Sequence, residues 1–307
     1  MSASRPPTFS SRLAKYVRGR GDGARRAYIV GRRLLAPKSY WARRRVATSV
    51  SPAAGVAVRD DDGYRLFHAG AFPEADAAAQ RCVSLVGKSE DVLRERRKAH
   101  ADKQFLVNLL DLSTLTADHP LLLLALRPDL LDAVIAYIGT VPILRSLQVF
   151  YSGAVDREPI SSQLYHCDAD DVRQLKIFLL CSEVGNDNGP LTILDAASSD
   201  RVRRATHYTY IDRLDDEQVA AIGGVKPPVE LVGPPGTMCL VDTSRCFHYG
   251  SRVRAGAGPR LVAMAQYLSP FAFVAPHGTR GALAHLANGA HTSLQRAVLT
   301  GDHGDLW

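Results

Sequence analysis

The segment SSQLYHCDAD (161–170) contains two side chains, His166 and Asp168, whose types and spacing suit a metal site. Positions i and i+2 of a β-strand point to one face, so this imidazole and this carboxylate would project side by side. A third candidate, His248, lies in a later segment, DTSRCFHYGS (242–251). Two histidines and one carboxylate leave the other positions of a metal ion open, which suits non-haem Fe(II) chemistry with dioxygen. We therefore predict that these three side chains bind one metal ion.

The His-x-Asp pattern has little specificity by itself, because it occurs again at His303 and Asp305. We interpret that second copy as a chance match, since no strand pattern surrounds it and no histidine follows it. His166 and Asp168 could also form a hydrogen-bonded pair without a metal. The elements around them and the later residues favour a ligand role.

The segments around the motif alternate between strand-like runs and turns. Strands are predicted at residues 59–67, 144–151, 174–184, 191–194, 237–241 and 259–267, with turns at 186–190 and 233–236. Helical patterns are found at residues 73–86, 90–103, 120–126, 128–138, 215–222 and 278–299. The pattern at 128–138 has the clearest boundaries, Pro128 near its start and Gly139 just past its end. The chain is therefore predicted to be mainly β with flanking helices.

This order of motifs resembles the phytanoyl-CoA dioxygenase family of Fe(II)/2-oxoglutarate oxygenases, over roughly residues 61–270. The resemblance covers the His-x-Asp pair, the NGPL turn at 188–191, the later histidine, and a following serine and arginine, Ser251 and Arg260. It implies a double-stranded β-helix, a jelly-roll or cupin-like barrel. The family's Pro-Gly-Ser-His sequence after the turn is absent, and DAASS (195–199) stands in its place.

The resemblance also implies the cofactors and the reaction. His166, Asp168 and His248 would hold Fe(II), and Ser251 and Arg260 would hold 2-oxoglutarate. The enzyme would hydroxylate a small-molecule substrate with dioxygen, giving succinate and CO2 as co-products. The serine and the arginine each lie one position later than in the family pattern, which is consistent with one inserted residue after the histidine. Two further arginines, at 252 and 254, are alternative partners for the cosubstrate.

Other polar residues near the motif have less defined roles. Asp170 shares the strand parity of the ligands, and we expect it at the rim of the pocket, whereas Cys167 should point away from the metal. His207 is a weaker candidate ligand than His248 because it lacks a strand context. It lies in an excursion, residues 196–229, that interrupts the strand pattern. The excursion is either a lid over the site or a surface insert.

Length and cysteine content limit the class of protein. With 307 residues and 46% hydrophobic content, the chain can bury one large core, and we predict a single oxygenase domain over residues 58–307. Five cysteines without a CxxC pattern argue against a disulfide framework or a structural zinc site, and a reducing cytoplasm is the simplest setting. The sequence contains no apolar run of membrane-spanning length and no apolar signal-peptide core.

Positive charge is concentrated in a basic N-terminal arm, residues 1–57. Residues 1–46 contain 13 Lys and Arg and one acid, Asp22, so subtracting +12 from the total of +7 leaves −5 for the remainder. Short helices at 13–18 and 28–35, or a mobile arm, fit this composition. The arm could contact nucleic acid or an anionic membrane. We favour a solvated tail or a helix packed on the body, and expect the arm to be dispensable for chemistry.

Two other functions use the same features. A non-catalytic barrel-fold binding protein would act through its basic arm. A zinc hydrolase would use the same three metal ligands, but no general base is evident near them. The complete ligand set together with Arg260 favours the oxygenase.

Overall fold

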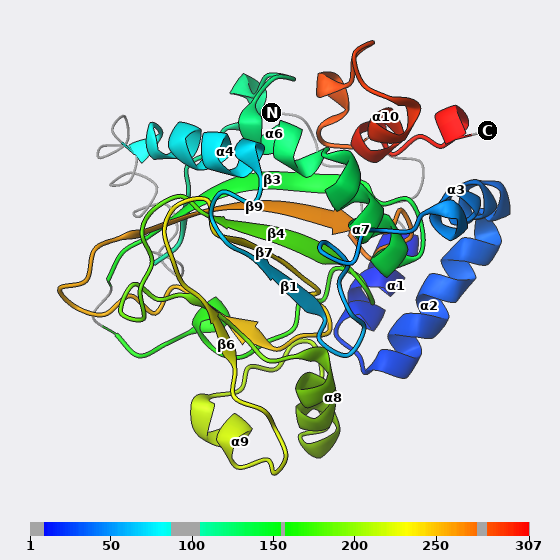
Figure 1. Ribbon diagram of the computed structural model, residues 1–307. Helices are drawn as coiled ribbons and strands as arrows, with labels where there is room; N and C mark the ends of the chain where they lie inside the picture. Colours follow the sequence, from blue (N-terminus) through cyan, green and yellow to red (C-terminus); the bar gives the residue numbers. More distant parts are fainter. Residues whose placement is uncertain (1–8, 87–104, 155–156, 275–280, 307) are drawn as a thin grey trace, which may run out of the picture.

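The computed structural model describes residues 9–86, 105–154, 157–274 and 281–306 (Figure 1). Its strands are β1 (Tyr64–Phe67), β2 (Val107–Asn108), β3 (Ile143–Ser152), β4 (Leu175–Leu180), β5 (Leu191–Ile193), β6 (Val229–Leu231), β7 (Met238–Val241), β8 (His248–Tyr249) and β9 (Arg260–Leu268). Its α-helices are α1 (Phe9–Arg18), α2 (Asp22–Leu35), α3 (Pro37–Ser49), α4 (Pro73–Val83), α6 (Pro120–Ala125), α7 (Pro128–Ile138), α8 (Ala196–Ala205), α9 (Asp216–Ala220) and α10 (Ser293–Thr300). The helical pattern at 90–103 lies outside the described residues.

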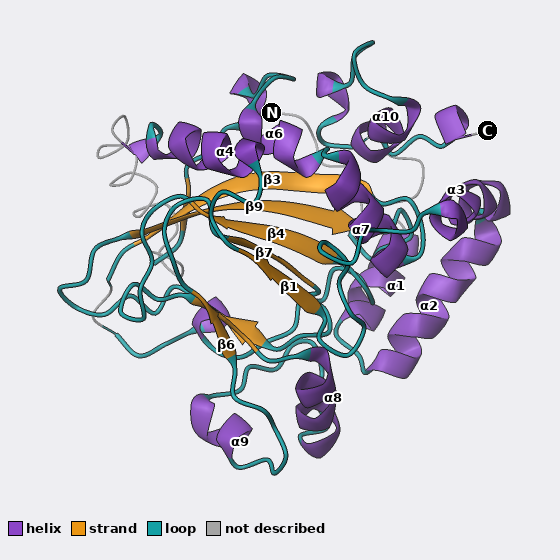
Figure 2. Cartoon of the chain, in the orientation of Figure 1, coloured by secondary structure: helices purple, strands orange, loops and turns teal. Residues whose placement is uncertain are grey.

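The strands form two antiparallel sheets, which Figure 2 shows one above the other. The large sheet has the order β1-β7-β4-β9-β3-β2, and the small sheet has the order β6-β5-β8. From β3 onward the chain passes back and forth between them, and an isolated pairing of His166 with His248 extends the small sheet beyond β8. This alternation is that of a double-stranded β-helix and confirms the predicted fold class. The described strands form two separate facing sheets and not one closed barrel.

Both faces of the large sheet are covered, which explains why every residue of β4 and β9 is buried. Ile177 and Ala265 belong to the core on the helical side, together with residues of α4, α6, α7 and α10. Phe178 and Met264, the sequence neighbours of Ile177 and Ala265, belong to the core shared with the small sheet. Period-two alternation therefore sends one set of side chains under the helices and the other set toward the site.

The flanking helices form at the positions along the chain where the sequence predicts them. Helix α7 has Pro128 in its first turn and ends at Gly139, whose φ of 77° is in the left-handed region, as predicted. Helices α4, α6 and α10 lie over β3 and β9 (Figure 1). The helical pattern predicted at 278–299 is shorter in the structure, where a 3-10 turn at residues 284–286 precedes α10.

The N-terminal segment forms three helices, α1 to α3, that pack against the body beside one end of the large sheet (Figure 1). Two of its arginines, Arg25 and Arg43, are fully buried. Arg43 donates hydrogen bonds to the carbonyl oxygens of Val141 (3.0 Å) and Gly301 (2.7 Å). Part of the positive charge therefore binds the body of the protein, as expected for helices packed on the body, and the dispensability of residues 1–46 for chemistry remains a prediction. The proposed domain boundary at residue 57 remains a prediction.

In the described part of the chain, no helix combines the length and the apolar character needed to cross a bilayer. All five cysteines are buried and carry free thiols, so the packing of the core rests on apolar contact and hydrogen bonding.

Candidate metal centre

A cavity of about 260 Å3 lies between the two sheets. Its floor consists of alternate residues on three neighbouring strands of the large sheet. The register pairs Gln148 of β3 with Met264 of β9, and Met264 with Phe178 of β4. Arg260 and Lys176 have the same parity on β9 and β4, so their charged side chains also face the cavity. The sheet geometry therefore brings two cations into a mostly apolar floor.

The structure brings together the three predicted ligands at this cavity. One ligand atom from each of His166, Asp168 and His248 lies within 4.8 Å of the other two. The two histidines are paired across the small sheet and exchange both backbone hydrogen bonds, at 3.1 and 3.0 Å. Asp168 lies beyond the paired residues, where its backbone N–H donates to the carbonyl of Thr243 at 2.7 Å. Strand pairing thus fixes both imidazoles, and a loop contact fixes the carboxylate.

Backbone carbonyls fix the tautomer of both histidines. Nδ1 of His166 lies 2.9 Å from the carbonyl oxygen of Leu164, and Nδ1 of His248 lies 3.0 Å from that of Cys246. A carbonyl only accepts, so each Nδ1 carries the proton and each Nε2 has a free lone pair. Both Nε2 atoms lie 3.9 Å from the carboxylate of Asp168. The three donor atoms converge on one space.

Burial keeps the two imidazoles neutral. It lowers the pKa of His166 to about 3, with a further contribution from His248, and it also lowers the pKa of His248. Burial alone would raise the pKa of Asp168, but Lys176 and the two histidines hold it well below its usual range. Two neutral nitrogen donors and one carboxylate are the donor set that divalent iron takes in facial sites, so the residues fit such an ion.

Lys176 is a site residue for which the sequence analysis assigned no role. Its Nζ lies 2.7 Å from Oδ2 of Asp168, and the lysine side chain is 11% exposed. A lysine within the otherwise apolar strand LKIFLL (175–180) was the available signal, because buried lysines are rare unless they are paired. The ion pair balances the carboxylate and sets its orientation.

The second predicted pair, Ser251 and Arg260, lines the same cavity. Arg260 is 4% exposed, and its Nη1 donates to Oγ of Ser251 at 3.0 Å. Its Nε is buried without a hydrogen-bond partner, and among the described residues no carboxylate pairs with it. Burial lowers the pKa of this guanidinium to about 10, which leaves it charged at neutral pH. A buried cation without an anion is a ready site for the carboxylate of a small ligand.

The alternative arginines, Arg252 and Arg254, already have partners. Arg252 pairs with Asp216 at 2.7 Å and stacks over the ring of Tyr249, with 3.5 Å between its guanidinium carbon and the ring centroid. Arg254 pairs with Asp187 at 2.8 Å, and its side chain is 75% exposed. Neither lines the cavity. Arg260 is therefore the better candidate for binding a cosubstrate.

The turn at 186–190 supports Ser251 directly. Gly189 has a φ of 67°, and its carbonyl accepts the backbone N–H of Ser251 at 3.0 Å. A Cβ at Gly189 would lie 2.5 Å from the backbone nitrogen of Arg252, so only glycine allows this approach. Ser251 itself has a φ of 64°, an uncommon value for a residue with a side chain. The turn holds this strained serine against Arg260.

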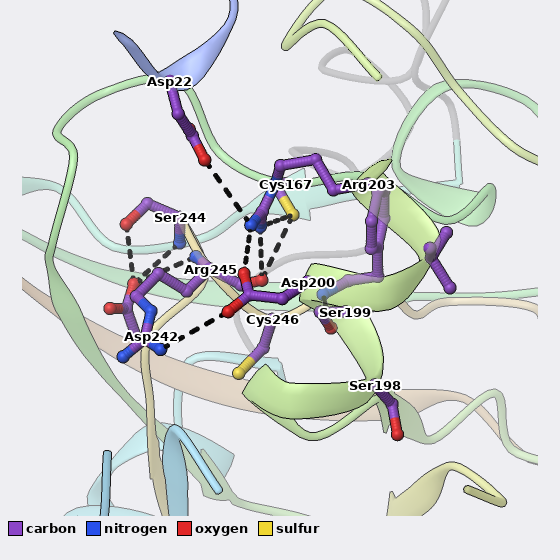
Figure 3. Close-up of polar contacts among 12 residues, drawn as sticks. Asp22, Cys167, Ser198, Ser199, Asp200, Arg203, Asp242, Ser244, Arg245 and Cys246 are labelled. Atoms are coloured by element: carbon purple, nitrogen blue, oxygen red, sulfur yellow. Dashed lines mark hydrogen bonds and ion pairs between the residues drawn. The ribbon is translucent and has the colours of Figure 1, made fainter. Parts of the chain in front are cut away.

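A polar network contacts the ligand-bearing segments on the side that faces away from the cavity (Figure 3). Arg203 of α8 donates to the carbonyl of Arg245 at 2.7 Å and lies 3.6 Å from the sulfur of Cys167. It also pairs with Asp200 and, at 3.7 Å, with Asp22 of α2. Cys167 therefore points away from the cavity, as its parity predicted. Arg203 ties the segments that carry the three candidate ligands to each other and to the N-terminal helices.

The DAASS segment (195–199) that departs from the family pattern opens helix α8. Asp195 caps the helix by accepting the backbone N–H of Ser198 at 2.6 Å. The hydroxyl of Ser199 accepts the backbone N–H of Phe247 at 2.8 Å, next to His248. The DAASS segment therefore begins a helix that braces strand β8.

The excursion at 196–229 forms part of the site wall. Leu214 exchanges backbone hydrogen bonds with Tyr165 at 2.9 and 3.0 Å, directly before His166. Arg213, which the sequence analysis did not single out, lines the cavity. His207 does not join the ligand cluster of the described residues. The excursion therefore contacts the site and is not a remote surface insert, whereas lid motion remains a prediction.

The remaining rim prediction concerned Asp170, which we expected to bond water. It instead pairs with Arg18 of α1 and accepts a hydrogen bond from the side chain of Gln266 at 3.0 Å. Asp170, two residues after Asp168, thus contacts the N-terminal helices directly.

No family model matches the sequence, and no curated protein matches it. Structure comparison finds EctD from S. alaskensis, in its apo form, with 21% sequence identity over 74% of this chain and 86% of that chain, at a TM-score of 0.45. HygX from Streptomyces hygroscopicus, solved with nickel and 2-oxoglutarate, has 15% identity over 69% of this chain and 85% of that chain, at a TM-score of 0.44. AviO1 from Streptomyces viridochromogenes Tue57 has 16% identity over 73% and 97%, at 0.43. These likenesses are weak in both sequence identity and TM-score.

Proposed function

We propose that the protein is a non-haem Fe(II)/2-oxoglutarate-dependent dioxygenase that hydroxylates a small molecule. One observation carries the proposal: two histidine nitrogens and one carboxylate converge in a cavity that also contains a buried arginine without an anionic partner. The first group fits a divalent iron, and the second fits the distal carboxylate of 2-oxoglutarate. Together, the bound iron and cosubstrate would supply activation of dioxygen, with succinate and CO2 as products.

The protein's own residues bind, orient and shield. His166 and His248 offer neutral Nε2 donors because their Nδ1 protons are held by backbone carbonyls. Lys176 balances the charge of Asp168 and fixes its orientation by donating to Oδ2 at 2.7 Å. Arg260 and Ser251 orient the cosubstrate along the cavity floor. The apolar floor residues exclude water from the reacting groups.

The size of the cavity favours a small substrate. At about 260 Å3, it lies just below the range typical of ligand pockets, about 300–1,000 Å3. The carboxylate of Asp168 favours hydroxylation over halogenation, because a halide would have to displace a charged ligand. A product 16 Da heavier than the substrate, measured by mass spectrometry, is the expected outcome.

The experiment that tests the proposal combines Fe(II) with 2-oxoglutarate under anaerobic conditions. We expect a weak visible charge-transfer band that appears only when both are present. His248→Ala should abolish stoichiometric iron binding, and the band with it. A protein that binds iron but gives no band with 2-oxoglutarate would contradict the proposed cosubstrate, and undiminished iron affinity in the variant would contradict the ligand assignment.

The same experiment separates the two alternatives. A binding protein that acts through its N-terminal helices would give no band. A zinc hydrolase needs a general base, and the only carboxylate among the described residues lining the cavity is Asp168 itself. The site therefore favours the oxygenase over both.

A further inference from the structure

The charged side chains that line the cavity are not balanced. Three cations, Lys176, Arg213 and Arg260, face one carboxylate, Asp168, among the described lining residues. The two histidines direct Nδ1 at the carbonyl oxygens of Leu164 and Cys246 and offer Nε2 as an uncharged donor to a metal. The cavity therefore has two more positive charges than negative ones before any ligand binds.

Loading the proposed cofactors does not remove this surplus. Fe(II) adds two positive charges, and 2-oxoglutarate adds two negative charges. Within the cavity, Lys176 is neutralised by Asp168 at 2.7 Å, and Arg260 would be neutralised by the cosubstrate. Arg213 is then the described lining cation that neither the protein nor the cosubstrate neutralises.

The surroundings of Arg213 keep it available. Its side chain is exposed, and among the described residues its Nη1 donates to the carbonyl oxygen of Asp212 at 2.6 Å. The adjacent carboxylate of Asp212 is occupied, because its Oδ2 accepts the backbone N–H and the hydroxyl of Thr209 at 2.7 and 2.8 Å. Among the described residues, no carboxylate forms an ion pair with Arg213. The backbone pairing of Leu214 with Tyr165 holds the next residue in place beside the ligand strand.

Two serines on the 3-10 turn before the metal motif lie in the same cavity wall. The hydroxyls of Ser161 and Ser162 make no hydrogen bond to another described residue. Ser161 has a φ of 53°, and Ser161 and Ser251 are two of the three described non-glycine residues with positive φ. Strained backbone is concentrated at functional sites, and both of these serines line the cavity. The wall thus offers hydroxyl donors as well as a free guanidinium.

We propose that the primary substrate carries an oxyanion, a carboxylate or a phosphate, that Arg213 binds at the solvent side of the cavity. The proposal rests on the proposed oxygenase function and extends it to the substrate class. A guanidinium presents a planar pair of donors that match either group. Anchoring the substrate at its anionic end directs the rest of the molecule toward the metal ligands, so Arg213 is a specificity-determining residue.

The test uses the full-length protein with Fe(II) and saturating 2-oxoglutarate under anaerobic conditions. The probes are benzoate, benzamide and phenyl phosphate, and their dissociation constants are measured by ligand-observed NMR. The variants are Arg213→Gln and Arg213→Lys, with Arg204→Gln as the matched control. Arg204 is an exposed arginine of α8 in the same excursion and does not line the cavity.

We expect benzoate or phenyl phosphate to bind about tenfold more tightly than benzamide, the gain of one charge-assisted contact. The preference should disappear in Arg213→Gln, persist in part in Arg213→Lys and remain unchanged in Arg204→Gln. Tighter binding of benzoate indicates a carboxylate substrate, and tighter binding of phenyl phosphate indicates a phosphate ester.

Three outcomes would overturn the inference: no binding of either anion at millimolar concentration, equal binding of acid and amide, or an anion preference that survives in Arg213→Gln. The iron and 2-oxoglutarate charge-transfer band serves as the separate control. If the band forms and the anion preference is absent, the inference about Arg213 fails alone. If the wild-type protein gives no band, the proposed function fails.

Discussion

Replacing Arg25 should destabilise the protein and weaken its metal site, although this arginine lies in the N-terminal segment and far from the motif in sequence. Its guanidinium is fully buried and donates to the carbonyl oxygens of Asp171 (2.7 Å) and Ala169 (3.3 Å). It also lies over the ring of Tyr210, with 3.5 Å between the guanidinium carbon and the ring centroid. These contacts hold the residues that directly follow Asp168.

The magnitude follows from those contacts. A hydrogen bond from a charged donor contributes about 1.5–3 kcal/mol, and a desolvated cation–π contact contributes about 2 kcal/mol. The desolvation of the guanidinium, which lowers the pKa of Arg25, offsets part of this gain. Arg25→Met removes the charge but also removes the donor to the carbonyls of Arg18, Ala169 and Asp171, so we expect a net loss of about 3 kcal/mol. With an unfolding entropy of about 2.1 cal/mol/K per residue, this loss corresponds for 307 residues to a Tm about 5 °C lower.

The assay compares Arg25→Met with Arg26→Met, because Arg26 is the exposed neighbour on the same helix. Urea denaturation of the metal-free proteins gives the free energy of unfolding, and Co(II) titration followed by visible absorption gives the metal affinity. Residues that orient a ligand typically change metal affinity 10- to 100-fold, so we expect a loss of about tenfold for Arg25→Met. Arg26→Met should resemble the wild type in both measurements.

The reasoning is refuted if Arg25→Met loses less than about 1 kcal/mol, or if the two variants behave alike. Deletion of residues 1–46 extends the test. The sequence alone led us to expect unimpaired chemistry, whereas the packing of Arg25 and Arg43 predicts a destabilised protein with weakened Co(II) binding. A deletion variant with full stability and metal affinity would show that the sequence-based expectation was correct.

Three further predictions concern the site. Arg260→Gln should raise the 2-oxoglutarate concentration needed for the charge-transfer band about 30-fold or more, with Co(II) affinity unchanged, and Arg254→Gln should behave as the wild type in the same titration. Burial lowers the folded-state pKa of His166 to about 3, so its contribution to the free energy of unfolding of the metal-free protein should be complete above pH 6.5 and be lost as the pH falls toward 3. In urea denaturation the loss should be about 1.4 kcal/mol per pH unit. His166→Gln should flatten that slope, and an unchanged slope would contradict the lowered pKa of His166. Gly189→Ala should destabilise the protein by more than Gly256→Ala. Both glycines have positive φ, but only at Gly189 would a Cβ lie against backbone atoms. Equal losses of unfolding free energy would show that the approach of Gly189 to the backbone of Arg252 is unimportant.

The sequence by itself determined the fold class and the candidate ligands. Strand periodicity, turn residues and the pair Pro128 and Gly139 are local signals, and they reflect backbone sterics that do not depend on distant contacts. The parity of His166 and Asp168 is local in the same sense. His248 was a candidate from its own later segment, the resemblance indicated Arg260, and the structure brings all four side chains to one cavity.

Tertiary structure alone decided the rest. The ion pair between Lys176 and Asp168, the position of Arg213 in the cavity wall and the contact of Arg25 with Asp171 each join residues on different segments. Such contacts arise from the pairing of strands and the docking of helices, and the spacing of residues along the chain does not specify them. For the same reason, a basic composition could not distinguish a solvated arm from helices whose arginines bind buried carbonyl groups. That distinction depends on which backbone groups the folded body leaves unpaired.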